Sequence, residues 1–422
     1  MKSPSGRRRA GRAPLRTNRP GFLTLAVLLV AASLVAGYLV LTRSDSTAPT
    51  ASAGKQAVPK AKKTPWDGRT KVLGDGSTSY TGPQQGELKP VPLKKGEKPP
   101  QFVVFSWDGA LQGDDELFSH YRELAKEYGA HMTFFLTGIY LLPKNKSDLY
   151  NPPQHPRGSA AISYATDEHI RTTLEQLGEA WKDGNEIGTH FNGHFCGTKG
   201  GGDWSVEEWK SEIDQFYDFV EHWKTNTGFT DIAPLPFDFK KEVTGGRAPC
   251  LEGQANLLKA IKSYKWAYDA SSAGDFQIWP KKKEGIWDFP LQMLPYEGGK
   301  YQGLSMDFNF LYNQSEGETE GDAAKYPEWE QETVNSYMAG FNRVYYGSRA
   351  PLFIGNHFED WNGGIYMKSI DQVIKNVCTK PGVKCVSFKE LAAWMDVQKP
   401  ETLERLRSLD PGQSPDWSTV VE

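Results

Sequence analysis

The chain has 422 residues, of which 38% are hydrophobic and 24% charged, so it is long enough for one barrel-sized domain with attachments and is not disordered throughout. Its formal net charge of -3 hides a strong partition: residues 1–20 carry +7, Arg43 adds one positive charge, and residues 44–100 carry +5. Subtracting these from the total leaves -16 for residues 101–422. An acidic body argues against nucleic acid as a partner, because such binding depends on neutralising phosphates.

Residues 21–42 contain no charged side chain and are nearly all apolar from Phe22 to Leu41. Twenty helical residues cover about 30 Å, the hydrocarbon thickness of a bilayer. We therefore expect a single-pass signal anchor, with the basic segment 1–20 in the cytoplasm and the rest of the chain outside the cell, held at the membrane. The alternative is a cleaved signal peptide, whose apolar region is usually only ~7–15 residues long.

Residues 43–100 are rich in Ser, Thr, Gly, Pro and Lys and show no sustained apolar period. Such a composition buries too little apolar surface to offset the entropy lost on ordering. The sequence therefore predicts a disordered stalk that spaces the body from the membrane.

Four cysteines fit a protein outside the cell. Cys378 and Cys385 flank a Pro-Gly turn signal, and Cys196 and Cys250 each follow a candidate chemical motif. We expect two disulfide bonds, and free buried thiols are the alternative.

From residue 101 onward, short apolar runs alternate with amphipathic stretches. Helices are expected over about 115–128 and 167–182, and Ser205 and Ser387 each begin a helix with a capping box. Strands are expected at 102–106, 132–136, 185–190, 243–247, 266–270, 286–292, 352–357 and 383–387. This alternation favours an α/β fold, a distorted (β/α) barrel of about seven or eight parallel strands, over an open doubly wound sheet. The domain is expected to span 101–396, followed by a C-terminal tail, 397–422.

Residues with metal-binding or acid–base side chains stand where predicted strands end. Asp108 follows the first strand, His190 and His194 follow the third, and His357 ends the strand 352–357. In parallel α/β barrels such side chains converge on one face, where active sites lie. One carboxylate and two imidazoles supply three ligands and leave positions for water, which is typical of an open, catalytic type of metal site.

Five motifs in chain order resemble those of the polysaccharide deacetylases, the family with the NodB homology domain (carbohydrate esterase family 4). The matching segments are Phe105-Ser-Trp-Asp-Gly109 for Thr-Phe-Asp-Asp-Gly, His190-Phe-Asn-Gly-His194 for His-Ser/Thr-x-x-His, Arg247-Ala-Pro249 for Arg-x-Pro, Asp269 after a strand, and Ile354-Gly-Asn-His357 for a Leu-x-His-like strand end. The resemblance covers roughly residues 101–396, and the order of the motifs makes it more specific than any one of them.

The resemblance implies that Asp108, His190 and His194 hold a divalent metal, usually zinc, which polarises an acetyl carbonyl and activates water. It makes His357 the general acid and Asp269 the group that orients it. Arg247 belongs to the motif that steadies the catalytic carboxylate in this family. An ordinary ion pair of Arg247 with Asp269 is the structural alternative.

The sequence departs from the family where the first Asp of Asp-Asp acts as the general base. Trp107 stands there, and an indole has no basic lone pair. Either another carboxylate replaces the base, or the metal-bound hydroxide suffices, or the protein binds glycan without hydrolysing it. The candidate replacements by loop position are Asp114, Asp115, Glu297, Asp307 and Asp360.

Insertions at 143–165 and 278–350 are expected to build loops over the barrel mouth. The second one carries aromatic side chains suited to stacking on sugar rings: Trp279, Trp287, Tyr296, Tyr301, Phe308, Phe310 and Tyr312.

The sequence thus predicts a membrane-anchored, extracytoplasmic, metal-dependent deacetylase of peptidoglycan or another acetylated glycan, removing N-acetyl or O-acetyl groups. The alternative is an inactive deacetylase-like module that binds glycan or a partner. A zinc peptidase is disfavoured because the Glu of His-Glu-x-x-His is absent, and position 191 is Phe.

Overall fold

The computed structural model describes residues 66–296 and 303–422. The expected anchor, 21–42, and residues 43–65 of the expected stalk lie outside the described residues. Within the described ranges, no helix combines the length and apolarity needed to cross a bilayer.

A parallel sheet forms the centre of the fold. Its strands are β3 (Gln101–Asp108), β4 (Thr133–Leu136), β5 (Glu186–Thr189), β9 (Leu352–His357) and β10 (Val383–Cys385). β3 is the central strand: β9 pairs with one of its edges, and β10 and β4 pair with the other. A second sheet contains β6 (Tyr268–Asp269), β8 (Ile286–Asp288) and β7 (Lys281–Lys283), and a hairpin contains β1 (Lys71–Leu73) and β2 (Thr78–Tyr80).

Backbone hydrogen bonds join the two larger sheets into a closed ring. The N–H of Arg247 donates to the carbonyl of Thr189, and the N–H of Ala270 donates to that of Gly246. On the far side, Ser305 donates to Gln292, and Gly355 donates to Ser305. The α/β fold with a parallel sheet that the sequence predicts is therefore confirmed, and seven of its eight expected strand segments contain strands, with 243–247 joined by an isolated bridge.

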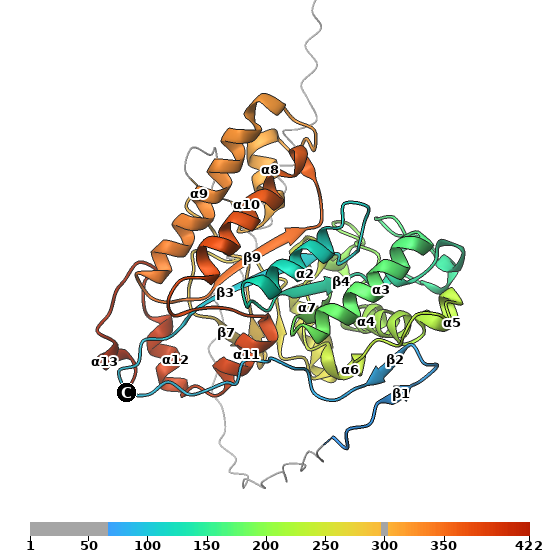
Figure 1. Ribbon diagram of the computed structural model, residues 1–422, viewed down its shortest axis with the longest axis horizontal. Helices are drawn as coiled ribbons and strands as arrows, with labels where there is room; N and C mark the ends of the chain where they lie inside the picture. Colours follow the sequence, from blue (N-terminus) through green and yellow to red (C-terminus); the bar gives the residue numbers. More distant parts are fainter. Residues whose placement is uncertain (1–65, 297–302) are drawn as a thin grey trace, which may run out of the picture. The chain divides into compact units, whose positions relative to one another are not determined.

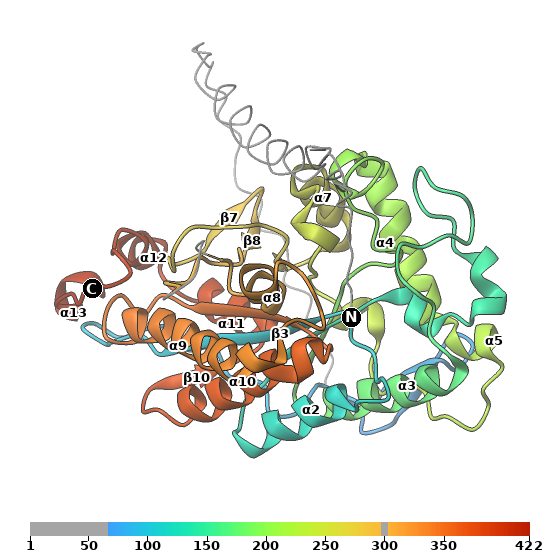
Figure 2. The ribbon, with the colours of Figure 1, turned by 90° about the horizontal axis from the view of Figure 1, so that it is seen from above.

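Helices surround this ring, and Figures 1 and 2 show α9 and α10 side by side along β9. The α-helices are α2 (Leu117–Glu127), α3 (Asp167–Lys182), α4 (Val206–Glu221), α5 (Trp223–Thr227), α6 (Phe239–Glu242), α7 (Gln254–Ile261), α8 (Asp307–Ser315), α9 (Tyr326–Tyr345), α10 (Trp361–Cys378), α11 (Phe388–Asp396), α12 (Pro400–Arg407) and α13 (Trp417–Val420). Short 3-10 helices are η1 (Gly138–Leu141), η2 (Lys144–Leu149), η3 (Gly201–Asp203), η4 (Pro249–Leu251), η5 (Lys262–Tyr264) and η6 (Ala323–Lys325).

Two helix starts follow directly from local sequence. The Ser205 and Ser387 side chains accept the N–H of Glu208 and Glu390, and each glutamate accepts the N–H of its serine. These reciprocal bonds satisfy donors that the first helical turn leaves free. Both capping boxes are therefore confirmed, as is the predicted helix 167–182.

The two faces of β3 pack into different layers. Val103, Phe105 and Trp107 belong to the core beneath the surrounding helices, whereas Phe102 and Val104 belong to the core inside the ring. Because side chains alternate along a strand, Asp108 lies on the inner face of β3. The strand thus directs its last carboxylate into the ring and its tryptophan toward the helices.

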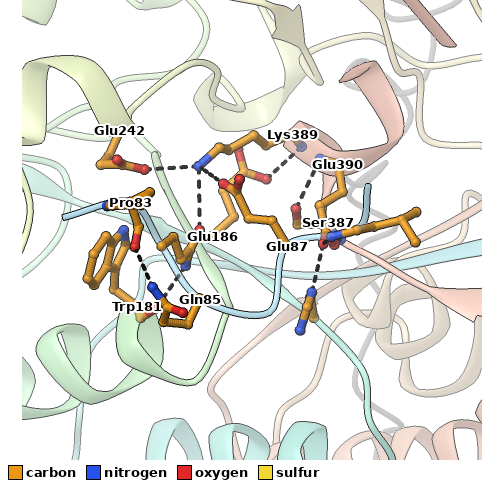
Figure 3. Close-up of polar contacts among 12 residues, drawn as sticks. Pro83, Gln85, Glu87, Trp181, Glu186, Glu242, Ser387, Lys389 and Glu390 are labelled. Atoms are coloured by element: carbon orange, nitrogen blue, oxygen red, sulfur yellow. Dashed lines mark hydrogen bonds and ion pairs between the residues drawn. The ribbon is translucent and has the colours of Figure 1, made fainter. Parts of the chain in front are cut away.

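The stalk prediction is wrong for residues 66–100. The N–H of Leu88 donates to the carboxylate of Glu390 at 2.6 Å, and Lys389 forms ion pairs with Glu87 at 2.7 Å and Glu242 at 2.9 Å. Figure 3 shows the Lys389 side chain reaching toward both carboxylates. These polar contacts hold the segment against the body, together with Leu88 and Leu93, which pack on the core that contains Phe102.

The C-terminal segment also belongs to the body. α12 and α13 follow residue 396, and Leu403, Leu406 and Val420 are buried in the same core as Phe102. The N–H of Gly96 donates to the carbonyl of Val421, so the two end segments of the described body are joined. The predicted tail, 397–422, is therefore packed structure.

Candidate active site

A cavity of about 500 Å³ opens where β3, β5 and β9 end. Asp108, His190, His194 and His357 all line it. They come from three separate strand ends, so the convergence predicted from the sequence is observed. Arg247 and Asp269 do not line this cavity.

Arg247 forms a buried ion pair with Asp108. The guanidinium Nη1 lies 2.8 Å from Oδ1 of Asp108 and also donates to the Ser106 hydroxyl at 3.0 Å, and both members of the ion pair are buried. Burial alone raises the pKa of the Asp108 carboxyl, but the Arg247 charge and the nearby imidazoles outweigh it, so the pKa lies below its usual value. Asp108 therefore presents an anionic carboxylate with one oxygen fixed by Arg247.

His190 has a defined tautomer. Its Nδ1 lies 2.8 Å from the carbonyl oxygen of Arg247, which only accepts, so Nδ1 carries the proton and Nε2 bears the lone pair. Nε2 is buried and has no hydrogen-bond partner among residues 66–296 and 303–422. Burial lowers the pKa of His190 to about 3 and also lowers that of His194. Both rings, with centroids 5.1 Å apart, are neutral acceptors at neutral pH.

His357 is bonded to Asp307, at the start of α8. Nδ1 of His357 donates to Oδ1 of Asp307 at 2.8 Å, and its backbone N–H donates to Oδ2 at 2.6 Å. Burial lowers the pKa of His357, but the charge and hydrogen bond of Asp307 outweigh it and raise it to about 9. Nε2 is left for the cavity, so the site holds a protonated imidazole opposite an anionic carboxylate.

The role expected for Asp269 is therefore wrong. Its carboxylate accepts from Gln254 at 2.6 Å and from the Ser271 hydroxyl at 2.7 Å. Burial raises its pKa to about 6. The alternative of an Arg247–Asp269 ion pair is also wrong, because Arg247 pairs with Asp108. Sequence reasoning placed Asp307 among loop carboxylates near the site, but nothing local marked it as the partner of His357.

The donor set fits a metal ion only in part. His190 and His194 are neutral, and the hydrogen bond from Nδ1 of His190 to a carbonyl is the outer contact typical of metal-binding histidines. Within the described ranges, one group of three ligand-type atoms lies within 4.8 Å of one another, and it contains His194 and the two cysteines of a disulfide bond, Cys196 and Cys250, which cannot act as thiolate ligands. Asp108, His190 and His194 do not form such a group, but all three line the same cavity and supply one carboxylate and two neutral imidazoles.

Trp107 lies away from the cavity. It is fully buried among Tyr121, Phe134 and Phe358, with ring centroids 4.5, 5.6 and 5.9 Å away. The geometry therefore does not place Trp107 where a general base would stand, and Asp108 is the carboxylate of β3 that faces the cavity.

The carboxylates considered as replacements for the general base differ in whether they line the cavity. Asp114, Asp115 and Asp360 line the cavity, as does Glu359, which the sequence analysis did not single out. Asp307 is engaged by His357, and Glu297 lies outside the described residues.

Of the aromatic residues in the second insertion, Phe308 lines the cavity and is 48% exposed. Trp279, Trp287 and Phe310 are buried in the core, and Tyr301 lies outside the described residues. Tyr296 packs on Phe310, and Tyr312 is exposed without lining the cavity. Trp361, at the start of α10, is the aromatic neighbour of Phe308 there, with ring centroids 6.1 Å apart.

Both predicted disulfide bonds are present, Cys196–Cys250 and Cys378–Cys385. The first joins the loop after His194 to the loop after Arg247. It therefore fixes the two loops that carry an imidazole and the guanidinium of the site relative to one another.

No protein-family model matches the chain, and no curated protein matches its sequence. Among solved structures, it is similar to an unconfirmed polysaccharide deacetylase from Mycobacterium smegmatis, with 13% identity over 74% of this chain and 97% of that one and a TM-score of 0.41. It is similar to the peptidoglycan deacetylase PdaC from Bacillus subtilis, with 13% identity, 70% and 92% coverage and a TM-score of 0.35. A third similar structure is BA3943, a CE4 family pseudoenzyme from Bacillus anthracis, with 11% identity, 74% and 72% coverage and a TM-score of 0.35.

Proposed function

We propose that this protein is a hydrolase that removes acetyl groups from a polysaccharide, N-acetyl groups first and O-acetyl groups second. The observation that carries the proposal is the pairing of a buried anionic carboxylate, Asp108, with a protonated imidazole, His357, across one cavity. A carboxylate that accepts a proton from water and an imidazolium that donates one to the leaving group are the two groups that amide or ester hydrolysis needs.

In this proposal Asp108 is the general base. Shifting the family motif by one residue aligns Ser106, Trp107 and Asp108 with Thr, Phe and the first Asp of Thr-Phe-Asp-Asp-Gly. The shift explains why Trp107 is an aromatic core residue and why Arg247 holds Asp108, as expected for the catalytic carboxylate. The shift also places Gly109 at the position of the second Asp of the motif. The general base is then retained as Asp108, and the carboxylate that the family uses as a metal ligand is the residue that is missing.

His357 acts as the general acid through Nε2, and Asp307 is the positioning residue that keeps this ring protonated and oriented. His190 and His194 would hold a divalent ion, probed first with zinc. When bound, the ion supplies Lewis-acid polarisation of the acetyl carbonyl.

The setting is proposed to be the outer face of a cell membrane, with residues 21–42 as the anchor and peptidoglycan or another acetylated glycan as substrate. The two disulfide bonds support an oxidising compartment. An inactive glycan-binding module remains the second candidate, favoured by the spacing of Asp108, His190 and His194, which do not form a three-ligand group within 4.8 Å.

The test is acetate release by the full chain from chito-oligosaccharides, peptidoglycan and O-acetylated xylan, with zinc supplied. We expect release from at least one substrate and a loss of about 10²–10⁴-fold in His357→Ala, because general acid help is removed. Folded protein that binds these glycans without releasing acetate would overturn the hydrolase and favour the binding module.

A further inference from the structure

A tyrosine stands beside the position of the missing carboxylate. In the motif alignment proposed for Asp108, that position is Gly109, whose φ is +71°. A Cβ atom on Gly109 would lie 3.5 Å from Cε2 and 3.7 Å from Oη of Tyr140, which belongs to η1. Both residues line the cavity that also holds His357. The hydroxyl of Tyr140 therefore borders the space that a second carboxylate would enter.

This hydroxyl is available to a ligand as a hydrogen-bond donor. Tyr140 is half-buried, and its Oη has no hydrogen-bond partner in the described part of the chain. Burial, reinforced by the negative charge of Glu359, raises the pKa of Tyr140 to about 12. The phenol thus keeps its proton at neutral pH. A neutral phenol does not supply the negative charge of the missing carboxylate, but it donates an O–H into the cavity.

The other side-chain donors that line the cavity are placed differently. The imidazolium of His357 has the proton for the leaving group, and Trp361 lies beside that ring, with centroids 5.5 Å apart. Oγ1 of Thr137 is enclosed by the protein, and no lysine or arginine is among the described residues that line the cavity. Tyr140 adjoins Gly109, the residue that follows the proposed base Asp108. Base and hydroxyl donor therefore border the same part of the cavity.

We propose that Tyr140 is a further catalytic residue, whose hydroxyl donates a hydrogen bond to the acetyl carbonyl oxygen and stabilises the negative charge that develops there. The inference rests on the proposed hydrolase. A donor directed at charge that appears only during the reaction lowers the barrier without tightening substrate binding.

The step balances with the groups already assigned. Asp108 takes a proton from water while the water oxygen bonds to the acetyl carbon, and the carbonyl π electrons move onto the oxygen that Tyr140 contacts. As the tetrahedral intermediate collapses, the bond from carbon to the leaving nitrogen or oxygen breaks, and His357 gives that atom its proton. Acetate leaves, and the proton on Asp108 returns to His357 through solvent.

The first test is acetate release by the full chain, with zinc supplied, in wild type, Tyr140→Phe and Tyr264→Phe. We expect Tyr140→Phe to lower kcat by about 10²–10³-fold and to leave KM nearly unchanged, because the lost hydrogen bond stabilises a charge that the bound substrate lacks. Tyr264→Phe is the matched control. It removes a hydroxyl that donates to Asp214 at 2.7 Å, outside the cavity, and should keep the wild-type rate. Circular dichroism checks the folding of each variant.

Calorimetry supplies a second readout that does not depend on turnover. One ligand is N-acetylglucosamine tetramer, and the other is the same tetramer with a methylphosphonamidate, tetrahedral and anionic like the intermediate, in place of one acetamide. Tyr140→Phe should bind the phosphonamidate about 10²–10³-fold more weakly than wild type and the acetamide equally well. Equal weakening for both ligands, or an unchanged kcat in Tyr140→Phe, would overturn the proposal.

The outcomes separate this inference from the proposed function. If wild type and Tyr140→Phe release acetate at the same rate, the hydrolase stands and the role of Tyr140 is disproved. If wild type releases no acetate, the hydrolase is disproved. In that case a preference for the phosphonamidate that Tyr140→Phe loses leaves the donor role of Tyr140 standing, and equal binding by the two proteins overturns it.

Discussion

Asp307 accepts two hydrogen bonds from His357. One carboxylate oxygen accepts the ring Nδ1–H at 2.8 Å, and the other accepts the backbone N–H at 2.6 Å. The contact joins the start of α8 to the end of β9 and fixes both the charge and the direction of the ring. Every role proposed for His357 depends on this contact.

Replacing Asp307 with Asn should lower the pKa of His357 from about 9 toward its ordinary value of 6.5, because the charge and the bond that outweigh burial are lost. The raised pKa means that the pair stabilises the fold fully below pH 6.5 and progressively less as pH rises to about 9. The free energy of unfolding of wild type should exceed that of Asp307→Asn by at most about 3 kcal/mol, and this difference should shrink as the pH rises from 6.5 to about 9.

NMR titration of the histidine ring measures the change in the pKa of His357. Denaturant unfolding of both proteins between about pH 5 and about pH 10 measures how the difference in their stability changes with pH. Asp269→Asn is the matched control, since that carboxylate bonds Gln254 and Ser271 and should leave the titration of His357 unchanged. A shift in the Asp269 variant but not in the Asp307 variant would restore the assignment made from the sequence.

Removing Arg247 should destabilise the protein through Asp108. Arg247→Met leaves a buried carboxylate without its cation, which costs about 3–5 kcal/mol in comparable buried pairs. The double variant Arg247→Met/Asp108→Asn should recover part of that loss, because the uncompensated charge is gone. Urea unfolding of the single and double variants measures this, and strictly additive losses would show that the two residues are not coupled.

Glu212 predicts a second pH dependence, beneath the histidine loop. It accepts from the Tyr150 hydroxyl and the N–H groups of Asn192 and Gly193, and burial raises its pKa from 4.5 to about 7. A raised pKa means that the stability from this group is present below pH 4.5 and lost as pH rises through about 7.

Wild type should therefore lose stability relative to Glu212→Gln between these two pH values, since glutamine does not ionise. Thermal unfolding at intervals across the range checks this. Parallel curves for the two proteins would mean that Glu212 stays ionised throughout.

The two disulfide bonds should differ in their contribution to stability. Cys196–Cys250 spans 54 residues and Cys378–Cys385 spans 7. Chain entropy predicts losses of about 4 and about 2 kcal/mol when each is removed as a Cys→Ser pair. Denaturant unfolding of the two pairs compares them, and a larger loss for the short loop would contradict the entropic account.

What the sequence predicted well is local or periodic. The capping boxes at Ser205 and Ser387 depend on residues three apart, and the strand ends carrying Asp108, His190 and His357 follow from apolar runs. The partner of His357 was missed because Asp307 is 50 residues away in sequence and no periodicity links them. Residues 66–100 were misjudged because single contacts with distant residues, such as that of Leu88 with Glu390, hold them without a sustained apolar pattern. The direction of the Trp107 side chain, toward the helices and away from the cavity, could not be predicted because the sequence does not show which face of β3 lies inside the ring.

The most direct test of the account compares acetate release by Asp108→Asn and Trp107→Phe, both made in the full chain and loaded with zinc. If Asp108 is the general base, Asp108→Asn should lose about 10²–10⁴-fold in rate, whereas Trp107→Phe should keep a rate near that of wild type. An Asp108→Asn variant that is folded and as active as wild type would contradict the account.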